Sequence, residues 1–467
     1  VNHFRDSIRD IGIQAEPYVT QSNGSIISIK ETIDCPIKTA LSGPSAGVIA
    51  AAFIGRQCEA DKIITFDMGG TSADISLIEN YTPQVSNERE VEGYPARIPM
   101  INIITIGAGG GSIAKIDDGG ALKVGPKSAG ADPGPACYMR GGEDPCVTDA
   151  NIVLGKLNSK KILGGRMDVD IELAKKAIRE KICDKSDLDL DRAANGIITV
   201  VNSNMVRAIR SVSVEKGYDV REFSLMAFGG AGPLHACEVA KELGMKDVLI
   251  PPHPGTLCSL GLLLADTKFD LSRTQVMDGK EENLEAINQQ FKNMVEQGTA
   301  LLDKEGVPAG RRVFQYFVDM RYQRQNFEIC IPVPAGEMDG AALAQALADF
   351  HAEHKRSYGY CKEEAVVQFV SSRVSAIGII DKPDLRPAQL HPEAPIPEPI
   401  EVRQVLFQGR EDYVAAPVYQ RDSFLPGQSI PGPCICEQMD TTLVVPQGWT
   451  IHVDGYHNLK IHDDEVK

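Results

Sequence analysis

A glycine-rich turn between two acidic residues carries the clearest chemical signal in the sequence. Residues 67–74 read Asp-Met-Gly-Gly-Thr-Ser-Ala-Asp, and the apolar runs on either side predict two strands. Paired glycines permit positive φ and close approach of a ligand, while successive backbone N–H groups in such a turn form an anion-binding concavity. The turn therefore predicts a phosphate-binding hairpin, with an ordinary tight hairpin as the alternative. Its predicted phosphate ligands are Gly69, Gly70, Thr71 and Ser72.

Two carboxylates bracket this turn, and we predict that both are catalytic: Asp67 and Asp74. Mg²⁺ prefers oxygen ligands and keeps part of its hydration shell, so we expect Asp67 to hold Mg²⁺ through water. No Gly-Lys-Ser/Thr follows the glycines, which excludes a Walker A loop.

A second combination of strand, glycine turn and helix follows at residues 223–243. A helix that begins at such a turn offers unpaired N–H groups and a partial positive charge, which predicts an anion or nucleotide site. The spacing is not Gly-x-Gly-x-x-Gly and disfavours a dinucleotide site. His235, in the first turn of the helix, is interpreted as structural rather than catalytic. The predicted cofactor-binding residues are Gly229, Gly230, Ala231 and Gly232.

Two other stretches keep two interpretations each. A predicted strand at 103–106 runs into a glycine run that forms either a simple bend or a wall of the substrate site. On the predicted helix 189–216, three polar residues share one face, which is either solvated or directed at a ligand. The candidate substrate residues are Gly109, Gly110, Gly111 and Ser112, and the helical face consists of Asn204, Arg207 and Arg210.

The composition excludes several classes of protein. The 467 residues carry 64 acidic and 48 basic side chains and a net charge of −16, without a Lys/Arg cluster, so we expect no nucleic-acid partner. No apolar run reaches the roughly 18 residues of a membrane span. The 11 cysteines are scattered, which predicts free thiols and a cytoplasmic location.

The pattern of elements predicts several domains in series. Residues 1–268 alternate strands, glycine turns and helices, whereas residues 269–382 combine amphipathic helices with alternating strands. A proline-rich linker is expected at 383–400, followed by a β-rich segment at 401–467.

Several motifs together resemble the hydantoinase A/oxoprolinase family, and two of them also resemble the wider actin, sugar-kinase and Hsp70 ATPase superfamily. The resemblance implies an α/β fold, half of an actin-like ATPase, with a C-terminal α+β region. The motifs are Leu-Ser-Gly-Pro-Ser-Ala-Gly at 41–47, the turns at 66–74, 107–112 and 227–235, Gly-Ala-Asp-Pro-Gly-Pro-Ala-Cys-Tyr at 130–138, Thr-Asp-Ala-Asn at 148–151 and Tyr-Gly-Tyr at 358–360.

The resemblance implies ATP and Mg²⁺ as cofactors and a hydantoinase B-type polypeptide as partner. It implies a subunit that opens a cyclic amide (a hydantoin, 5-oxoproline or a lactam) through a phosphorylated carbonyl. A subunit of a ketone carboxylase acting on acetone or acetophenone is the first alternative, and a non-catalytic assembly partner is the second. The motifs concern ATP and do not distinguish the acceptors.

One family feature is not found in the sequence. Family members open with another Asp-x-Gly-Gly-Thr loop, about two hundred residues before the second, and this chain contains only the loop at 67–71. We therefore expect that an N-terminal domain is missing and must be supplied in cis or in trans. We expect negligible ATPase activity from this chain alone, because phosphoryl transfer depends on clamping the phosphates from both sides.

Overall fold

A computed structural model describes the whole chain except residues 1, 16, 87–88, 92–93, 97 and 466–467. The chain divides into two compact units, each built from separate stretches of sequence. Unit 1 contains residues 1–42, 86–100 and 262–383, and unit 2 contains residues 43–85, 101–261 and 384–467. This division differs from the predicted series of domains. Residues 1–42 belong to the same unit as residues 262–383, and residues 384–467 belong to the same unit as residues 43–85 and 101–261.

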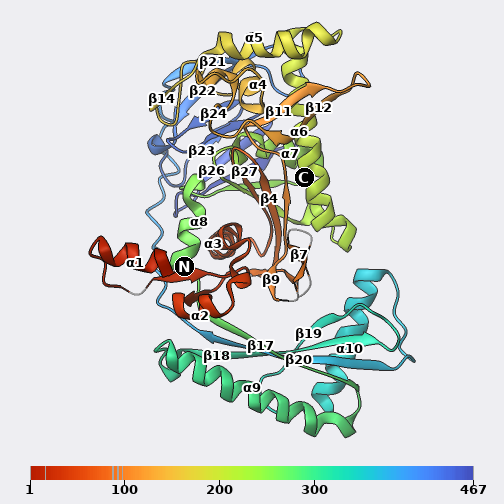
Figure 1. Cartoon of the computed structure of the whole chain (residues 1–467). Helices are drawn as coiled ribbons and strands as arrows, with labels where there is room; N and C mark the ends of the chain where they lie inside the picture. The colour runs from red at the N-terminus through yellow and green to blue at the C-terminus, as the bar shows by residue number, and fades with distance from the viewer. Residues whose placement is uncertain (1, 16, 87–88, 92–93, 97, 466–467) are drawn as a thin grey trace. The chain divides into compact units, whose positions relative to one another are not determined.

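Unit 2 is organised by a nine-stranded sheet of order β10-β4-β3-β15-β16-β27-β26-β23, with β5 beside β4. β3, β4 and β10 are antiparallel, whereas β15 and β16 run parallel to β3. β27 pairs with β16, so the C-terminal strands continue the sheet. β23, β26 and β27 lie together in unit 2 (Figure 1). The strands are β3 (Lys62–Met68), β4 (Ala73–Glu79), β5 (Thr82–Pro83), β10 (Ile103–Ile106), β15 (Ser224–Phe228), β16 (Asp247–Ile250), β23 (Ser429–Pro431), β26 (Trp449–Val453) and β27 (Leu459–Asp463).

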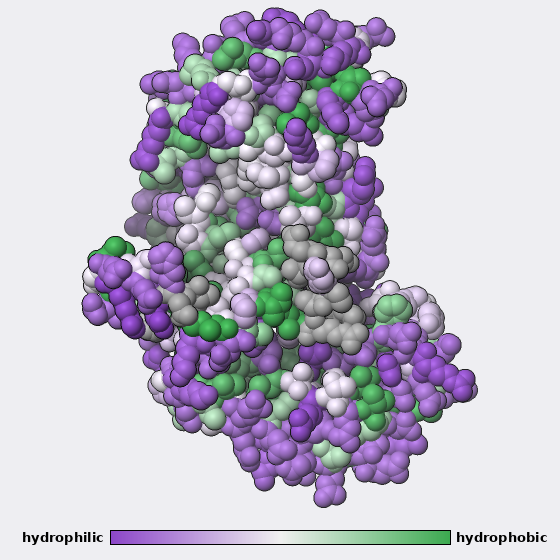
Figure 2. Space-filling view, in the orientation of Figure 1, coloured by the Kyte–Doolittle hydropathy of each residue, from purple (hydrophilic) through white to green (hydrophobic). Residues whose placement is uncertain are grey.

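Two helices of unit 2, α6 and α7, bury apolar stripes against this sheet. α6 alone buries eleven residues, among them Ile197, Val201 and Ile209, in the same core as Phe66 and Leu225 of the central strands. α5 buries only three residues, and the surface around it is largely hydrophilic (Figure 2). The helices are α3 (Ser42–Cys58), α4 (Val147–Val153), α5 (Ile171–Lys181), α6 (Leu190–Val212), α7 (Gly232–Leu243) and α8 (Leu257–Leu264). The first residue of α3 and the last three of α8 belong to unit 1.

Smaller sheets complete unit 2. A four-stranded sheet of order β21-β22-β24-β25 is formed by the segment that follows the proline-rich stretch. Two hairpins, β11–β12 and β13–β14, flank α4 in the sequence. Their bounds are β11 (Ser112–Ile116), β12 (Leu122–Ser128), β13 (Lys161–Ile162), β14 (Met167–Asp168), β21 (Glu401–Val405), β22 (Val414–Gln420), β24 (Cys434–Glu437) and β25 (Thr442–Val445).

Unit 1 is an α+β body around a six-stranded sheet of order β1-β2-β17-β20-β18-β19. Its core joins Phe291 of α9 and Phe350 of α10 to Val318 and Val374 of the central strands. The predicted boundary at residue 268 lies inside β17, so the strand does not end where the sequence pattern changes. The elements are α1 (Asn2–Asp10), β1 (Tyr18–Thr20), β2 (Ile26–Ser28), α2 (Ile29–Asp34), β17 (Thr267–Asp278), α9 (Leu284–Lys304), β18 (Arg312–Tyr322), β19 (Ile329–Val333), α10 (Gly340–Tyr358) and β20 (Val367–Gly378).

The α/β fold class is therefore as predicted. In the part of the chain that the structure describes, no helix combines the length and apolarity needed to cross a membrane.

Candidate functional site

The predicted phosphate hairpin is formed by β3 and β4 in unit 2. Asp67 pairs in register with Asp74, and the Gly69 N–H donates to the Ser72 carbonyl over 3.1 Å to close the tip. Neither Gly69 nor Gly70 has a positive φ, although positive φ was one of the two reasons expected for glycine at these positions. A Cβ at either position would meet no atom within 4 Å. Glycine at the tip therefore leaves open space beside the backbone rather than relieving strain.

The glycine run at 107–112 packs directly on this tip. The N–H groups of Gly110 and Gly111 donate to the carbonyls of Gly69 and Gly70 over 3.0 and 2.7 Å. A Cβ on Gly109 would lie 2.5 Å from the Thr71 nitrogen, a distance that real Cβ atoms do not reach. The predicted substrate residues thus lie against the predicted phosphate residues, and Gly109 is needed for that backbone contact.

Gly109→Ala is expected to lower the free energy of unfolding by about 1–3 kcal/mol, as overpacking of a tight contact does. Gly70→Ala is the matched control, since its Cβ would enter open space and should leave the melting temperature unchanged. Thermal unfolding followed by circular dichroism compares the two. Equal melting temperatures for both variants would show that the loop moves aside without cost.

The second glycine turn lies beside the end of β3. Ala231 donates its N–H to the Met68 carbonyl over 2.9 Å, and Gly229 has a φ of +75°. A Cβ on Gly229 would lie 2.4 Å from Oδ1 of Asp67. The two predicted nucleotide turns are therefore in contact at the same ends of parallel strands β3 and β15, and α7 begins there at Gly232.

Asp67 is partly buried between this turn and α8. Its Oδ2 accepts a hydrogen bond from the Cys258 thiol over 3.6 Å. Burial, and after it the carboxylate of Asp74, raises the pKa of Asp67 to about 6, against the opposing effect of the thiol. Asp74 accepts a hydrogen bond from the Thr105 hydroxyl on β10. The hairpin thus holds two carboxylates whose negative charges repel each other.

A cavity of about 510 Å³ opens beside the two turns. Gly69, Gly70, Gly230 and Ala231 line it, whereas Asp67, Asp74, Thr71 and Ser72 are absent from its lining. Its other walls come from α4, from β13 with the loop before it, and from the β24–β25 turn. They include Thr148, Asn158, Lys161, Gln438 and Thr441. The structure brings four of the eight predicted phosphate- and nucleotide-binding residues into one cavity.

The C-terminal segment supplies a wall of this cavity that the sequence does not reveal. The Thr441 hydroxyl donates to the Gly230 carbonyl over 3.0 Å, and Asp440 accepts the Gly255 N–H over 2.8 Å. Behind them, buried Arg421 donates to Gln438 over 2.8 Å and to two backbone carbonyls. No motif marks these residues, because their role depends on a pairing across two hundred positions.

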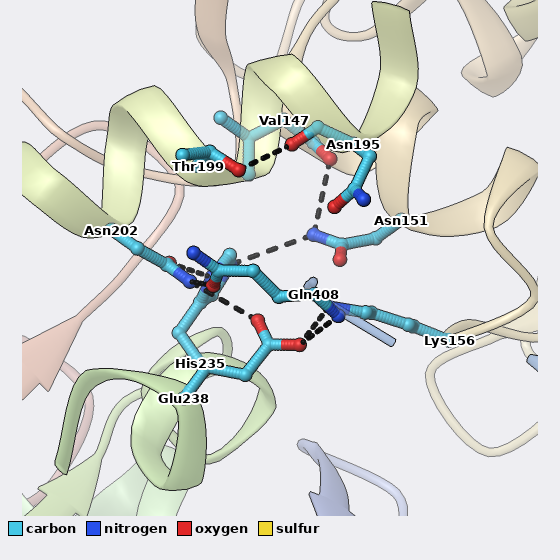
Figure 3. Close-up of polar contacts among 9 residues, drawn as sticks. All are labelled: Val147, Asn151, Lys156, Asn195, Thr199, Asn202, His235, Glu238 and Gln408. Carbon is cyan, nitrogen blue, oxygen red and sulfur yellow. Dashed lines mark hydrogen bonds and ion pairs between the residues drawn. The ribbon is translucent and has the colours of Figure 1, made fainter. Parts of the chain in front are cut away.

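A buried polar network connects α4, α6 and α7 (Figure 3). Lys156, fully buried, donates to Oε1 of Glu238 over 2.6 Å, and the Gln408 N–H donates to the same oxygen over 3.1 Å. Asn202 donates to Oε2 of Glu238 over 3.1 Å. Burial opposes ionisation of Glu238, but the Lys156 ammonium and the Gln408 N–H hold the pKa of Glu238 below its usual value.

His235 completes the network as a neutral residue. Its Nδ1 donates to Oδ1 of Asn202 over 2.8 Å, since the Asn202 amide nitrogen is engaged by Glu238 and Gln408. Burial, reinforced by Lys156, lowers the pKa of His235 to about 4. Asn151 of α4 contacts Nε2 over 3.5 Å. This environment agrees with the structural role expected for His235.

The same helix α4 holds the glycine run of the site. Both the N–H and the hydroxyl of Thr148 donate to the Gly110 carbonyl, over 2.8 and 2.9 Å. Since Asn151 of α4 contacts His235 near the start of α7, one helix fixes the glycine run against the nucleotide turn.

Comparison with known proteins gives matches over nearly the whole chain. Residues 1–271 match the Hydantoinase/oxoprolinase family and residues 275–463 match the Hydantoinase/oxoprolinase C-terminal domain. The caprolactamase subunit alpha of Pseudomonas jessenii is 37% identical over 448 residues, which cover 95% of this chain and 64% of that protein.

Two solved structures have the same fold over this length. The crystal structure of the ATP-dependent caprolactamase from Pseudomonas jessenii superimposes with a TM-score of 0.89 at 35% identity, covering 99% of this chain and 68% of that one. A nucleotide-free acetone carboxylase has a TM-score of 0.77 at 27% identity, with 98% and 66% coverage. The chain thus spans about two thirds of the length of these proteins.

Proposed function

Because the chain belongs to the hydantoinase/oxoprolinase family, we propose that it carries an ATP-binding part of an enzyme that uses ATP to open a cyclic amide. The observation that supports this most directly is the contact between the hairpin tip and the Gly229–Gly232 turn, where Ala231 donates to Met68 over 2.9 Å. A cyclic amide is favoured over a ketone, since similarity to the caprolactamase exceeds similarity to the acetone carboxylase in both identity and TM-score.

In this proposal ATP lies across the ends of β3 and β15. The phosphates face Gly69, Gly70, Thr71 and Ser72, and the adenosine lies at Gly229–Gly232 beside the 510 Å³ cavity. The bare backbone at Gly69 and Gly70 permits the approach, and the N-terminus of α7 favours negative charge. The wall formed by Gly109–Ser112 then faces the acceptor, because it touches the hairpin tip.

The carboxylates of the hairpin fit a Mg²⁺ ion that accompanies ATP. Asp74 contributes to the raised pKa of Asp67, so the pair carries negative charge that a cation would relieve. Among the described residues no cluster of three or more metal-ligating side chains occurs. That suits Mg²⁺, which commonly takes one or two carboxylates and completes its shell with phosphate oxygens and water. Bound Mg²⁺ would neutralise phosphate charge, while Asp67 orients it directly or through water.

The chemistry that follows is activation of the amide. Transfer of a phosphoryl group from ATP to the amide carbonyl oxygen would release ADP and make the carbonyl carbon a better electrophile. Water would then add to that carbon and the C–N bond would break, giving an amine and an acyl phosphate that a second water hydrolyses to the carboxylate and phosphate. Residues of this chain position the phosphates, since phosphoryl transfer depends mainly on positioning and electrostatic stabilisation.

We further propose that activity requires polypeptide beyond this sequence. The chain spans about two thirds of its relatives, and the caprolactamase relative is a subunit by name. A further domain, in cis or in trans, would supply the opposing phosphate loop, and a hydantoinase B-type subunit would complete the acceptor site.

All eleven cysteines are free thiols, which fits the cytoplasmic location that we propose.

Nucleotide titration of the assembled enzyme tests the proposed site. Gly230→Val places a branched side chain in the cavity, where a Cβ meets only Asp440 at 3.5 Å, and should weaken ATP affinity at least about tenfold, a difference of 1.4 kcal/mol. Gly310→Val, in open space in unit 1, is the control. Unchanged ATP affinity in the Gly230 variant would refute the proposed nucleotide site.

ATPase assays with lactams, hydantoins and ketones, with and without bicarbonate, then identify the acceptor substrate.

A further inference from the structure

A second cavity of unit 2 lies along α6, outside the nucleotide site. It has a volume of about 440 Å³, within the usual range for small-molecule sites. We call it the α6 cavity, and its apolar wall consists mainly of Ile104, Ile106, Val124, Pro126 and Ala208. Asn204, Arg207, Ser211 and Glu215 supply its polar groups.

The two charged groups of the α6 cavity are not used by the fold, whereas the Ser211 hydroxyl donates to the Ala208 carbonyl over 2.8 Å. Among the described residues, the Arg207 guanidinium has no ion pair or hydrogen bond, and neither has the Glu215 carboxylate. The Asn204 amide makes one long hydrogen bond of 3.4 Å, to the Val124 carbonyl. One cation and one anion therefore line the same apolar cavity without neutralising each other.

The position of Arg207 distinguishes it from a solvated residue of the same helix. Arg210 lies three positions later on the same polar face and is also exposed, but it does not line the cavity. Gly107 and Ala108 form a wall of the cavity that Arg207 also lines. That wall continues into Gly110, which donates to Gly69 at the hairpin tip over 3.0 Å.

We propose that the α6 cavity binds a linear aliphatic amino acid with its two charges at opposite ends. The carboxylate pairs with Arg207 and accepts from Asn204, the methylene chain packs on Ile104 and Val124, and the ammonium group pairs with Glu215. The choice of this ligand rests on the proposed function: when water adds to a cyclic amide, the C–N bond breaks, oxygen joins the carbonyl carbon and a proton joins the nitrogen. The product carries a carboxylate and an ammonium group on one chain, so the cavity would receive the opened ring.

Binding of 6-aminohexanoate to the assembled enzyme without nucleotide, measured by calorimetry, tests this inference. Arg207→Gln should weaken binding by roughly tenfold or more, as loss of a charge-assisted hydrogen bond does. Arg210→Gln, the matched control, should leave affinity unchanged. Hexanoate should bind more weakly than 6-aminohexanoate to the wild type, and Glu215→Gln should abolish that preference.

Several outcomes would overturn the inference. They are absence of saturable 6-aminohexanoate binding, equal weakening in the Arg207 and Arg210 variants, and equal affinities for hexanoate and 6-aminohexanoate in the wild type. Nucleotide titration distinguishes failure of the proposed amino-acid site from failure of the proposed ATP site. Loss of amino-acid binding with intact Gly230-dependent ATP binding refutes only the α6 cavity, whereas the reverse result refutes only the ATP site.

Discussion

Lys156→Met is expected to lower the free energy of unfolding by ~3–5 kcal/mol, the cost of leaving one member of a buried ion pair unpaired. Lys156 is fully buried and its Nζ lies 2.6 Å from Oε1 of Glu238. Methionine fills similar volume but leaves the Glu238 carboxylate without its cation. The remaining donors, Asn202 and Gln408, cannot neutralise its charge. Denaturant unfolding followed by circular dichroism measures the loss.

Two comparisons separate the loss of the buried pair from a general loss of charge. Lys175 makes an ion pair of 2.7 Å with Glu172 on α5, but the pair is more exposed, so Lys175→Met should change stability by less than about 1 kcal/mol. Adding Glu238→Gln to Lys156→Met should recover part of the loss, since it removes the unpaired charge. A double variant whose loss equals the sum of the two single losses would show that the pair is not coupled.

The elements that the sequence predicts well are local ones. The hairpin 62–79 and the unit of strand, turn and helix at 224–243 each depend on residues within about twenty positions, and their glycines and apolar runs are visible in the pattern. Of the two reasons expected for glycine at 69 and 70, open space beside the backbone is present, whereas positive φ is not.

The elements that the sequence predicts poorly depend on distant partners. β27 pairs with β16 so that His462 lies opposite Asp247, and no local signal connects strands that far apart. The C-terminal segment therefore reads as a separate β-rich region, although Thr441 lines the candidate site. Arg421 illustrates the same difficulty: an isolated arginine in a turn is usually solvated, but here it is buried and donates to the carbonyls of Ile250 and His457.

Asp67→Asn is expected to reduce ATP cleavage by the assembled enzyme by about 10²–10³, comparable to losing one electrostatic stabiliser of a transition state. The amide keeps the shape of the carboxylate but loses the charge that would orient Mg²⁺. ATPase turnover under saturating nucleotide measures the effect. Asp118→Asn, an exposed carboxyl on the loop before β12, serves as the control and should leave turnover unchanged.

The same substitution should increase stability when nucleotide and Mg²⁺ are absent. The pKa of Asp67 is raised from 3.8 to about 6, so the folded state binds the proton more tightly than the unfolded state, and stability falls as pH rises between these values. Above pH 6 the full cost is present, and Asp67→Asn should be more stable than the wild type by roughly 2–3 kcal/mol. Below about pH 4 the difference should vanish. A variant that is less stable than the wild type at pH 8 would show that the Asp67 carboxylate is a structural anchor, and the loss of turnover could then not be assigned to Mg²⁺ or phosphate.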